Sequence, residues 1–309
     1  MAVTYSIIIP HYNIPDLLMR CLSSIPVRPD VQVIVIDDCS PDAATYRQRY
    51  PQLSRQYLEL YSTTQSGSAG RARNVGLDHA TGRWLIFADA DDFFADSLSE
   101  VLDRYAHDDS DLIYFGSRKV MSDDISKPSQ RSHWLDDVWS DYERDHDITS
   151  LCGRHSVVWG KFFSRDVALR HGIRFDETRY SNDFYFAASM ACNSPRVKMD
   201  RQILYFVTER AGSLANSMHC KEGELAERAA VCFRVEQQLL SHGIYTKPFE
   251  PFNVYMSLLY RRDRQLYYHY FRLMPTIGYP RRLALRQFCH GQSLWQTLKV
   301  YVLSFLSLI

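Results

Sequence analysis

The sequence lacks the features of a secreted, disulfide-stabilised protein. Its seven cysteines are odd in number and scattered, and no two of them form a C-x-x-C pair. This usage fits reduced thiols in a cytosolic compartment better than disulfides or a zinc site. No basic segment precedes the first apolar run, residues 7–9, and Pro10 and His11 end that run at once. We therefore expect no signal peptide.

Long hydrophobic runs and an excess of one charge are also missing. No apolar run reaches the roughly 20 residues of a transmembrane helix. The 36 Lys and Arg residues balance 36 Asp and Glu residues, which argues against a nucleic-acid binder. A hydrophobic content of 46% over 309 residues is sufficient for a globular core. We expect a cytoplasmic globular protein of one large domain or two smaller ones.

The stretch around which the chain is organised runs from Arg83 to Phe94. An apolar segment suited to a buried strand stops at Asp89, and Asp91 and Asp92 follow within four positions. A buried strand that delivers acidic groups to its carboxyl end is typical of ligand sites in α/β sheets. In extended backbone Asp89 and Asp91 would face the same side, where two carboxylates suit Mg²⁺ or Mn²⁺. An acidic turn that only solvates the strand end explains this short motif equally well.

Strand and helix patterns alternate through the first half of the chain. Residues 5–10 and 31–36 have the pattern of buried strands, and a helix that opens at Pro15 lies between them. This order predicts a βαβ unit and hence a parallel sheet. The same reasoning predicts strands at residues 57–61, 83–88 and 111–115 and a helix at residues 71–80.

Two regions depart from this pattern. Residues 121–147 are polar, acidic and rich in turn formers, so we expect a long loop or an insertion over the sheet. From Glu222 the pattern is helical to the end, and Asp263 is the only acidic residue after Glu250. Basic residues and tyrosines alternate there; the basic residues are Arg261, Arg262, Arg264, Arg272, Arg281, Arg282, Arg286 and Lys299.

Seven blocks in the expected order resemble the family-2 glycosyltransferases, which have the GT-A fold and use nucleotide-sugar donors. The blocks are residues 6–13, 33–42, 70–76, 87–92, 159–163, 181–184 and 209–213. The chain differs from the family pattern at His11, where a small residue is usual, at Cys39, where glycine is common, and at Asn182, where the family has an acidic residue.

The resemblance implies an α/β GT-A domain over residues 1–216, with a mostly parallel sheet flanked by helices. Residues 1–115 would bind the nucleotide sugar and residues 116–216 the acceptor. A helical extension rich in basic and aromatic residues, 217–309, would follow.

The resemblance also implies roles for individual residues. Asp91 is expected to bind Mn²⁺ or Mg²⁺, with Asp89 on the ribose or on the waters of the metal. Asp183 is expected to be the catalytic base, although the residue pattern alone also fits a helix cap. The expected donor-binding residues are Pro10, Tyr12, Asn13, Asp38, Arg71, Arg73, Asn74 and Asp89.

Several of these roles have ordinary alternatives. Arg71 and Arg73 lie at a helix N-terminus, which favours anions, but they also suit a solvated helix face. Asp38 is placed to accept a hydrogen bond from the N3–H of uracil, or to cap the turn before Ser40. The acceptor side is expected to include Lys161, Asp176 and Glu177, each of which fits a surface position equally well. Four histidines without metal-ligand spacing are interpreted as surface or loop residues: His11, His155, His171 and His219.

The chemistry of the reaction can be stated without the family. A departing nucleoside diphosphate needs its charge neutralised, and the acceptor hydroxyl needs a base. One base and no enzyme nucleophile imply inversion at the anomeric carbon. The resemblance adds the expectation of a metal-dependent transfer from a UDP-sugar to a glycan acceptor, lipid-linked or lipid-anchored, in surface polysaccharide or lipopolysaccharide synthesis.

Two other classes of protein stay open. A nucleotidyltransferase would normally need a glycine-rich loop after the first strand, where this chain has Pro10-His11-Tyr12-Asn13. A non-catalytic, membrane-associated binding protein would use the acidic residues only structurally.

The last residues of the chain suggest a membrane contact. One face of a helix would carry Leu294, Trp295, Leu298, Val302, Phe305, Leu306 and Ile309. This face is too short to span a bilayer but suits its interface, next to the basic segment. We expect peripheral attachment to the inner face of the cell membrane. Docking on the protein's own core, or on a second copy in a homodimer, is the alternative.

Overall fold

The computed structural model describes residues 2–129, 134–145, 148–209, 222–244 and 250–279. Its centre is an eight-stranded sheet with the strand order β3-β2-β1-β4-β7-β6-β8-β5. The strands are β1 (Tyr5–His11), β2 (Val31–Asp37), β3 (Leu58–Ser62), β4 (Trp84–Phe87), β5 (Phe93–Phe94), β6 (Leu112–Met121), β7 (Lys161–Ser164) and β8 (Val197–Glu209). This architecture confirms the predicted α/β fold.

The first half of the sheet is parallel, as the strand and helix pattern predicts. β1 pairs in parallel with β2 and β4, and β2 pairs in parallel with β3. Helix α1 (Pro15–Ser23) connects β1 to β2, and α3 (Ala69–His79) connects β3 to β4. Alternate residues of β1 lie in two different core clusters, Ile7 on one face and Ile8 on the other. Both faces are therefore covered, which explains the near-continuous apolar strands.

The second half of the sheet is mixed. β7 runs antiparallel to β4 and β6, whereas β6 and β8 run parallel to each other. The short β5 pairs antiparallel with β8, directly after the acidic stretch. The helices of this half are α4 (Leu98–Tyr105), α5 (Trp134–Asp145), α6 (Ile148–Arg154), α7 (Arg165–Arg170) and α8 (Phe184–Cys192).

The expectation of a loop over residues 121–147 is wrong for its second part. Residues 134–145 form helix α5. Val138 is fully buried, and Trp139 and Tyr142 pack against the same core. These apolar positions recur at helical spacing among acidic residues, so the composition hid an amphipathic helix.

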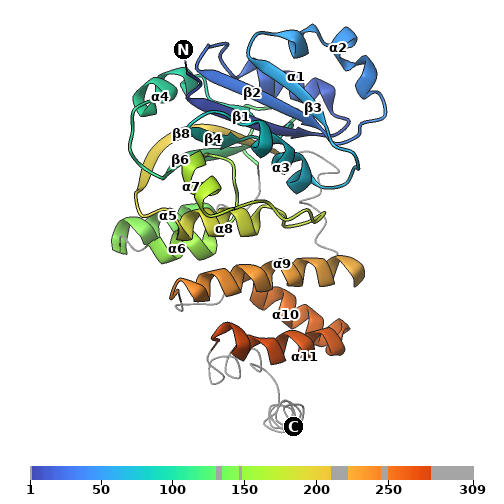
Figure 1. Ribbon diagram of the computed structural model, residues 1–309, viewed down its shortest axis with the longest axis vertical. Coiled ribbons are helices and arrows are strands. Elements are labelled where there is room, and N and C mark those ends of the chain that lie inside the picture. Colours follow the sequence, from blue (N-terminus) through green and yellow to red (C-terminus); the bar gives the residue numbers. More distant parts are fainter. Residues whose placement is uncertain (1, 130–133, 146–147, 210–221, 245–249, 280–309) are drawn as a thin grey trace.

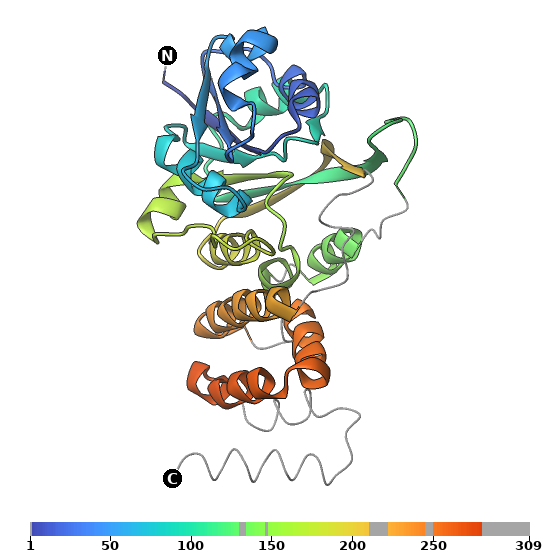
Figure 2. The same cartoon turned by 90° about the vertical axis from the view of Figure 1, so that its right-hand side faces the viewer.

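The C-terminal helices continue the core of the second half. They are α9 (Glu222–Ser241), α10 (Glu250–Arg262) and α11 (Arg264–Leu273). Figures 1 and 2 show α5, α6 and α8 between the sheet and α9, with α10 and α11 beyond. Ala229, Cys232 and Val235 of α9 belong to one core cluster with Ala187 and Met190 of α8. None of the helices that the structure describes is long and apolar enough to cross a bilayer.

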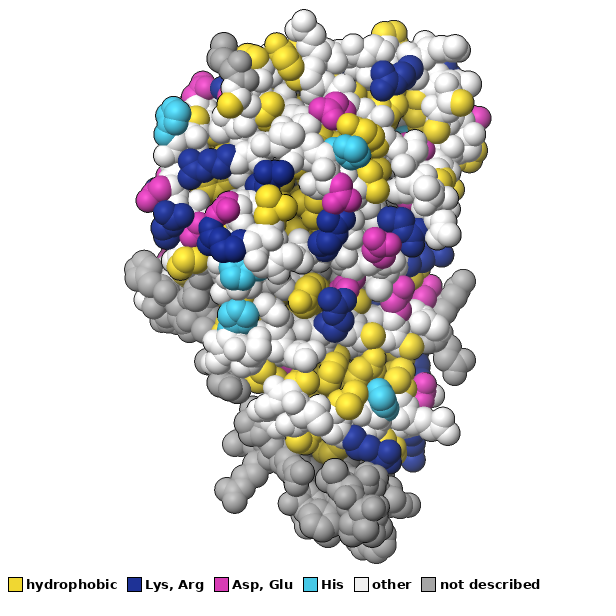
Figure 3. Space-filling model, viewed as in Figure 1, with side chains coloured by type: hydrophobic (Ala, Val, Ile, Leu, Met, Phe, Trp, Pro, Cys, Tyr) yellow, Lys and Arg dark blue, Asp and Glu magenta, His cyan; other side chains and the backbone are white. Residues whose placement is uncertain are grey.

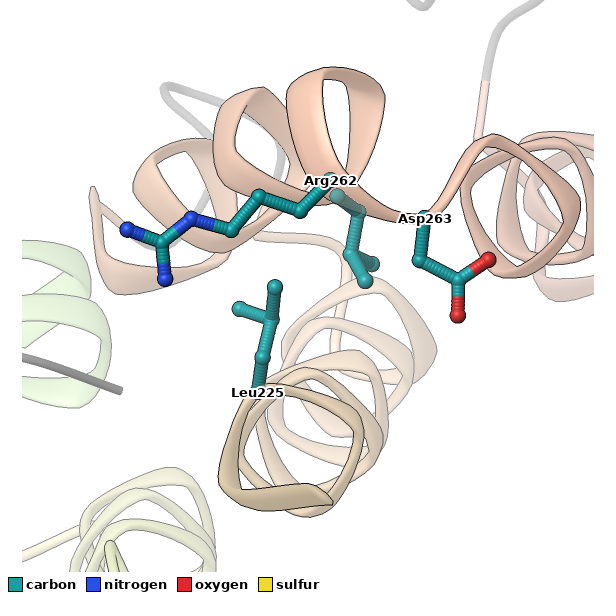
Figure 4. Close-up of a pocket in the computed structure, with 4 residues that line it drawn as sticks. Leu225, Arg262 and Asp263 are labelled. Atoms are coloured by element: carbon teal, nitrogen blue, oxygen red, sulfur yellow. The ribbon is translucent and has the colours of Figure 1, made fainter. Parts of the chain in front are cut away.

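A hollow of about 300 Å³ lies among these C-terminal helices. Leu225 of α9 and Leu259, Arg262 and Asp263 at the junction of α10 and α11 line it. Figure 4 shows the side chains of Arg262 and Asp263 pointing in opposite directions. The hollow lies away from the strand ends that carry the predicted site residues, so it is not the predicted donor site.

Candidate active site

The loops after β1 and β2 are joined by a buried polar network. His11 Nδ1 lies 3.0 Å from Asp37 Oδ1, and His11 Nε2 accepts a hydrogen bond from the Ile14 amide. His11 therefore carries its proton on Nδ1 and donates to Asp37. Ser40 also donates to Asp37 through its amide and its hydroxyl, at 2.8 and 2.6 Å. Burial alone would raise the pKa of Asp37, but the hydrogen bonds from His11 and Ser40 outweigh it and hold that pKa below its usual value.

This network explains the unusual His11 and corrects the interpretation of two histidines. His11 and His155 are buried, with 2% and 3% of their area exposed, so a surface position is wrong for both, although His155 does lie in a loop. His219 lies outside the described residues. The amide of Asn13 donates to Ser40 Oγ at 2.8 Å, so the loop that carries Pro10, Tyr12 and Asn13 is tied to the loop after β2. Tyr12 remains exposed, at 53%.

Asp38 is buried beneath the loop that precedes α3. Its carboxylate accepts hydrogen bonds from Thr63 Oγ1 at 2.8 Å and from the amides of Gly67 and Ser68 at 2.6 and 3.1 Å. The turn at Ser40 is capped by Asp37 instead. The capping role expected of Asp38 therefore belongs to Asp37, and Asp38 fixes the entrance to α3.

The acidic residues after β4 lie on a turn, not on an extended strand. β4 ends at Phe87, and the amide of Asp92 donates to the carbonyl of Asp89 at 3.0 Å. The expectation that Asp89 and Asp91 share one side through extended backbone is therefore wrong, because the chain reverses between them. Both side chains are partly exposed, and Asp92 is buried.

Three residues from distant parts of the chain hold this turn. Arg20 of α1 and Thr208 of β8 both donate to the carbonyl of Asp91, at 2.5 and 2.6 Å. Tyr205 of β8 accepts from the amide of Asp89 at 2.8 Å. No motif in the sequence marks these three residues. Tyr205 and Thr208 of β8 lie more than 110 positions from the turn.

Asp92, the third acidic residue of the turn, ties the turn to β8. It accepts a hydrogen bond from the Thr208 amide at 2.7 Å. Burial, with the charges of Asp89 and Asp91, raises the pKa of Asp92 well above its usual value. A divalent cation near this turn would relieve the repulsion among the three carboxylates.

Arg73 of α3 joins the acidic turn to the segment before α8. Its guanidinium donates to Asp89 Oδ1 at 2.6 Å and to Asn182 Oδ1 at 2.8 Å, and it lies over the ring of Phe175. Arg73 is 5% exposed, so the alternative of a solvated helix face is wrong for this residue. Asn182 accepts this hydrogen bond without adding a negative charge, and Asp89 forms the ion pair with Arg73.

Asp183 directly precedes α8 and does not cap it. The side chain makes no capping hydrogen bond, so the capping alternative is wrong. Burial raises the pKa of Asp183 from 3.8 to about 6, although the charge of Arg73 lowers it. A carboxylate with this pKa is ionised at neutral pH and is a stronger base than an ordinary aspartate.

The start of α3 approaches the segment 175–177 closely. A Cβ atom on Gly70 would lie 1.9 Å from the carbonyl oxygen of Asp176, so only glycine fits there. Asn74 donates to the carbonyl of Phe175 and to Glu177 and accepts from the Phe175 amide. Its amide group is thus occupied in holding this segment, and the expected donor contact is not supported in this arrangement.

Arg71 and Glu177 face each other at the edge of the same region. Arg71 Nε donates to Glu177 Oε2 at 3.0 Å, and Nη1 donates to the carbonyl of Gln65. The hydrogen bond from Arg71 lowers the pKa of Glu177. Glu177 is exposed and Arg71 partly so, which leaves this pair accessible to a ligand.

Lys161 and Asp176 are buried, so the surface alternative is wrong for both. Lys161 is 1% exposed, and its ammonium donates to the carbonyls of His155 and Val157. Burial lowers the pKa of Lys161 well below its usual value, and Asp183 opposes this shift. Lys161 therefore lies beneath the site, where its charge favours the ionised form of Asp183.

Three residues at the site have left-handed backbone conformations. They are Asn13 with φ 51°, Cys39 with φ 62° and Ser181 with φ 55°. Such conformations are costly for residues other than glycine and cluster at functional sites. The value at Cys39 explains why glycine suits that position.

These features define the class of the protein. The carboxyl ends of the parallel strands β1, β2 and β4 meet at one sheet edge, and Arg73 joins the acidic turn there to the segment that carries Asp183. This sheet with its flanking helices is the GT-A fold of glycosyltransferases, as the sequence implied. The chain belongs to glycosyl transferase family 2, whose family model matches residues 6–172.

Relatives agree with this assignment. The chain is 26% identical over 219 residues to an uncharacterized glycosyltransferase, EpsJ of Bacillus subtilis, a match that covers 68% of this chain and 62% of EpsJ. It is 23% identical over 237 residues to the poly(ribitol-phosphate) beta-N-acetylglucosaminyltransferase TarS of Staphylococcus aureus, covering 72% of this chain and 39% of TarS. The matches thus span less than two thirds of either relative.

A solved structure shows the same fold. Residues 1–349 of S. aureus TarS, in complex with UDP-GlcNAc, superpose with a TM-score of 0.63 and 18% sequence identity. The match covers 93% of this chain and 89% of that chain, so it includes the C-terminal helices as well as the sheet.

Proposed function

We propose that this protein transfers a sugar from a UDP-sugar to a hydroxyl of a cell-surface glycan, with inversion at the anomeric carbon. The observation that carries this proposal is the arrangement of Asp183. It is a partly buried carboxylate with a raised pKa, beside an arginine that also holds the acidic turn.

The donor side of the proposal rests on the sheet edge. Tyr12 is exposed next to the loop that is tied to the end of β2, where a base can stack on its ring. Asp38 already accepts three hydrogen bonds, so a contact with uracil would use its remaining lone-pair capacity. The complex of TarS with UDP-GlcNAc supports a uridine nucleotide.

Asp91 and Asp89 would hold Mn²⁺ or Mg²⁺ together with the diphosphate. Their hard oxygens suit these ions, and no group of three or more potential ligands forms among the described residues, so phosphates would complete the shell. Such an ion supplies Lewis-acid stabilisation of the departing diphosphate. Arg73, already bonded to Asp89, adds positive charge beside the same phosphates.

Asp183 would take the proton of the acceptor hydroxyl as that oxygen attacks the anomeric carbon. The bond from that carbon to the diphosphate breaks on the opposite face, and the nucleoside diphosphate leaves. Of the nearby acids, Asp176 is paired with Arg234 and Glu177 with Arg71. Asp183 is therefore the best-placed base, and a single base gives inversion.

The acceptor would be a polymer or lipid-linked glycan of the cell surface. TarS is named as an enzyme acting on poly(ribitol-phosphate), and another relative, 28% identical over 189 residues, is the minor teichoic acid biosynthesis protein GgaB of Bacillus subtilis.

No observation favours a nucleotidyltransferase or a non-catalytic, membrane-associated binding protein. The buried network at His11 occupies the place where a nucleotidyltransferase would have its glycine-rich loop.

The proposal is tested by nucleotide release. Intact protein is incubated with Mn²⁺ and UDP-GlcNAc, UDP-glucose, UDP-galactose or UDP-N-acetylgalactosamine, in water and with teichoic-acid acceptors. We expect free UDP to accumulate from at least one donor and to accumulate faster with an acceptor. Free UMP or pyrophosphate would indicate nucleotidyl transfer, and no release from any donor would contradict the proposal.

We also propose peripheral attachment through the C-terminal region. Arg261, Arg262, Arg264 and Arg272 are exposed, whereas Tyr267 and Tyr270 of the same segment are buried in the core. These two aromatic residues therefore serve packing, whereas the four arginines of the described part of this region lie at the surface. Figure 3 shows Lys and Arg side chains near hydrophobic ones on this part of one face. The expected apolar helix at residues 294–309 lies outside the described residues.

Vesicle binding tests this attachment. Four cations near an anionic surface contribute about 1 kcal/mol each, so roughly 4 kcal/mol in total. We expect the intact chain to sediment with phosphatidylglycerol vesicles but not with phosphatidylcholine vesicles, and salt to weaken binding. Replacing the four arginines by glutamine should reduce binding more than replacing four exposed residues of the first half. No binding by the intact chain would contradict the proposal, and a concentration-dependent dimer would favour self-association.

A further inference from the structure

Helix α9 lies directly against the segment that carries the proposed base. Residues 176–183 lead into α8, and α9 packs along α8 through a shared core (Figure 1). The roles carried over from the family stop at about residue 213, so none of them falls on α9. Yet its polar residues contact this segment at several points.

The first contact joins α9 to Asp176. Arg234 donates to Asp176 Oδ1, and its guanidinium lies 4.2 Å from the ring centroid of Tyr185 in α8. The Asp176 side chain is only 6% exposed, and its Oδ2 is buried without a hydrogen bond from any described residue. Arg234 is therefore the counter-charge that makes burial of this carboxylate tolerable.

A second group of contacts lies about two to three turns earlier on α9. Glu227 accepts a hydrogen bond from the Arg179 amide at 3.1 Å, and Glu224 accepts from the Tyr180 hydroxyl at 2.9 Å. The Arg228 guanidinium lies 4.2 Å from the ring centroid of Tyr180. Helix α9 therefore contacts the backbone of Arg179 and both the hydroxyl group and the ring of Tyr180.

The sequence of α9 places these groups on one side of the helix. Glu224, Glu227, Arg228 and Arg234 are separated by three, one and six positions, which corresponds to an arc of roughly 120° at 3.6 residues per turn. Ala229, Cys232 and Val235 point into the core. The orientation of α9 is therefore fixed by two sets of its own residues. The apolar set packs against α8, and the polar set contacts the segment 176–183.

The opposite side of the segment is held by α3. Glu177 is bonded to Arg71, and Ser68 Oγ donates to the carbonyl of Thr178 at 3.0 Å. Ser181, two residues before the base, has the left-handed φ of 55°. A strained conformation persists only where its surroundings over-determine it, and α3 and α9 together do so here.

We propose that α9 positions the catalytic base, with Arg234 as the chief positioning residue. Loss of the Arg234 contact would release Asp176 and allow the segment 176–183 to shift, and Asp183 would shift with it. Tyr12 and Asp38 would keep their positions, because their loops are held by contacts with Ser40, Thr63 and Gly67 that lie outside this segment. This inference rests on the proposed function, in which Asp183 takes the proton of the acceptor.

The test compares Arg234→Gln with Arg170→Gln. Arg170 also pairs with an aspartate, Asp166, but the side chains of both residues are exposed. With the donor that releases UDP fastest, we expect Arg234→Gln to lower kcat roughly 10- to 100-fold, because small misplacements of a reacting group are costly. The KM for the donor and the affinity for UDP should stay within about twofold. Arg170→Gln should match the wild type in kcat, in the KM for the donor and in the affinity for UDP.

Two further readouts separate positioning from general destabilisation. Hydrogen exchange in Arg234→Gln should increase in residues 176–183 but not in β1 or β2. The effects of Arg234→Gln and Asp176→Asn on kcat should be non-additive in the double variant, because each substitution removes the same contact between these two side chains.

Each outcome has a defined meaning. An Arg234→Gln protein that behaves like Arg170→Gln in kcat and exchange would overturn the proposal. So would an equal loss of UDP affinity and kcat, because that would indicate damage to the whole site. If the wild type releases no UDP from any donor, the proposed function fails, whereas the exchange measurement still decides whether α9 holds the segment.

Discussion

Asp183→Asn is expected to lower the rate of sugar transfer by about 10²–10⁴-fold, the usual contribution of a positioned general base. Affinity for UDP should be unchanged, because the lost group acts on the acceptor in the transition state. Wild-type activity should rise with pH through about 6, where Asp183 loses its proton, and then level off. Steady-state kinetics between pH 5 and 8, with calorimetry of UDP binding, measure both effects.

The same substitution should not destabilise the fold at neutral pH. The folded-state pKa of Asp183 is raised, from 3.8 to about 6, so the folded state binds its proton more tightly than the unfolded state does. Stability therefore falls as pH rises through this window, and asparagine removes that penalty. The matched control is Asp109→Asn, at an exposed aspartate whose carboxylate lies 3.7 Å from the Arg196 guanidinium. Near wild-type turnover by Asp183→Asn would show that another group is the base.

The second large effect is expected at the acidic turn. Asp91→Asn should reduce turnover by at least about 100-fold, since even indirect partners of a catalytic metal are worth 10–100-fold. The thermal midpoint should stay the same or rise, because the variant relieves repulsion with Asp89 and with the buried Asp92. Turnover is measured with Mn²⁺, with Mg²⁺ and with excess chelator.

Asp96→Asn is the control for this substitution, because Asp96 is exposed and lies five residues beyond Asp91. Its turnover and its metal dependence should match those of the wild type. Full wild-type activity in excess chelator would show that the reaction does not need a divalent metal ion.

Much of the fold follows from local pattern. The β-branched run of β2 and the apolar segment of β4 predict buried parallel strands, and the blocks at residues 70–76 and 87–92 correctly marked the start of α3 and the acidic turn. These signals are local because period, capping and composition act over a few residues. The interpretation failed at α5, where acidic residues outnumber the apolar ones that turn toward the core.

The parts of the site that the sequence did not reveal depend on contacts between distant residues. Arg20 and Thr208 both bind the carbonyl of Asp91, but neither is part of a motif. For Lys161 the sequence fitted the acceptor side and a surface position equally well, because sequence alone does not show that the carbonyls of His155 and Val157 bind its ammonium inside the core. The pairing of Arg234 with Asp176 likewise depends on how α9 docks, which no local pattern encodes.

Inversion with Asp183 as the base is best tested by the anomeric configuration of the sugar as it is released or transferred. Proton NMR of the reaction of the intact enzyme with an α-configured UDP-sugar, using water or a small alcohol as acceptor, shows the first anomer formed. Direct displacement with Asp183 as base predicts the β anomer first, and loss of that signal in Asp183→Asn. An α product formed first would contradict the account, because it would require retention of configuration.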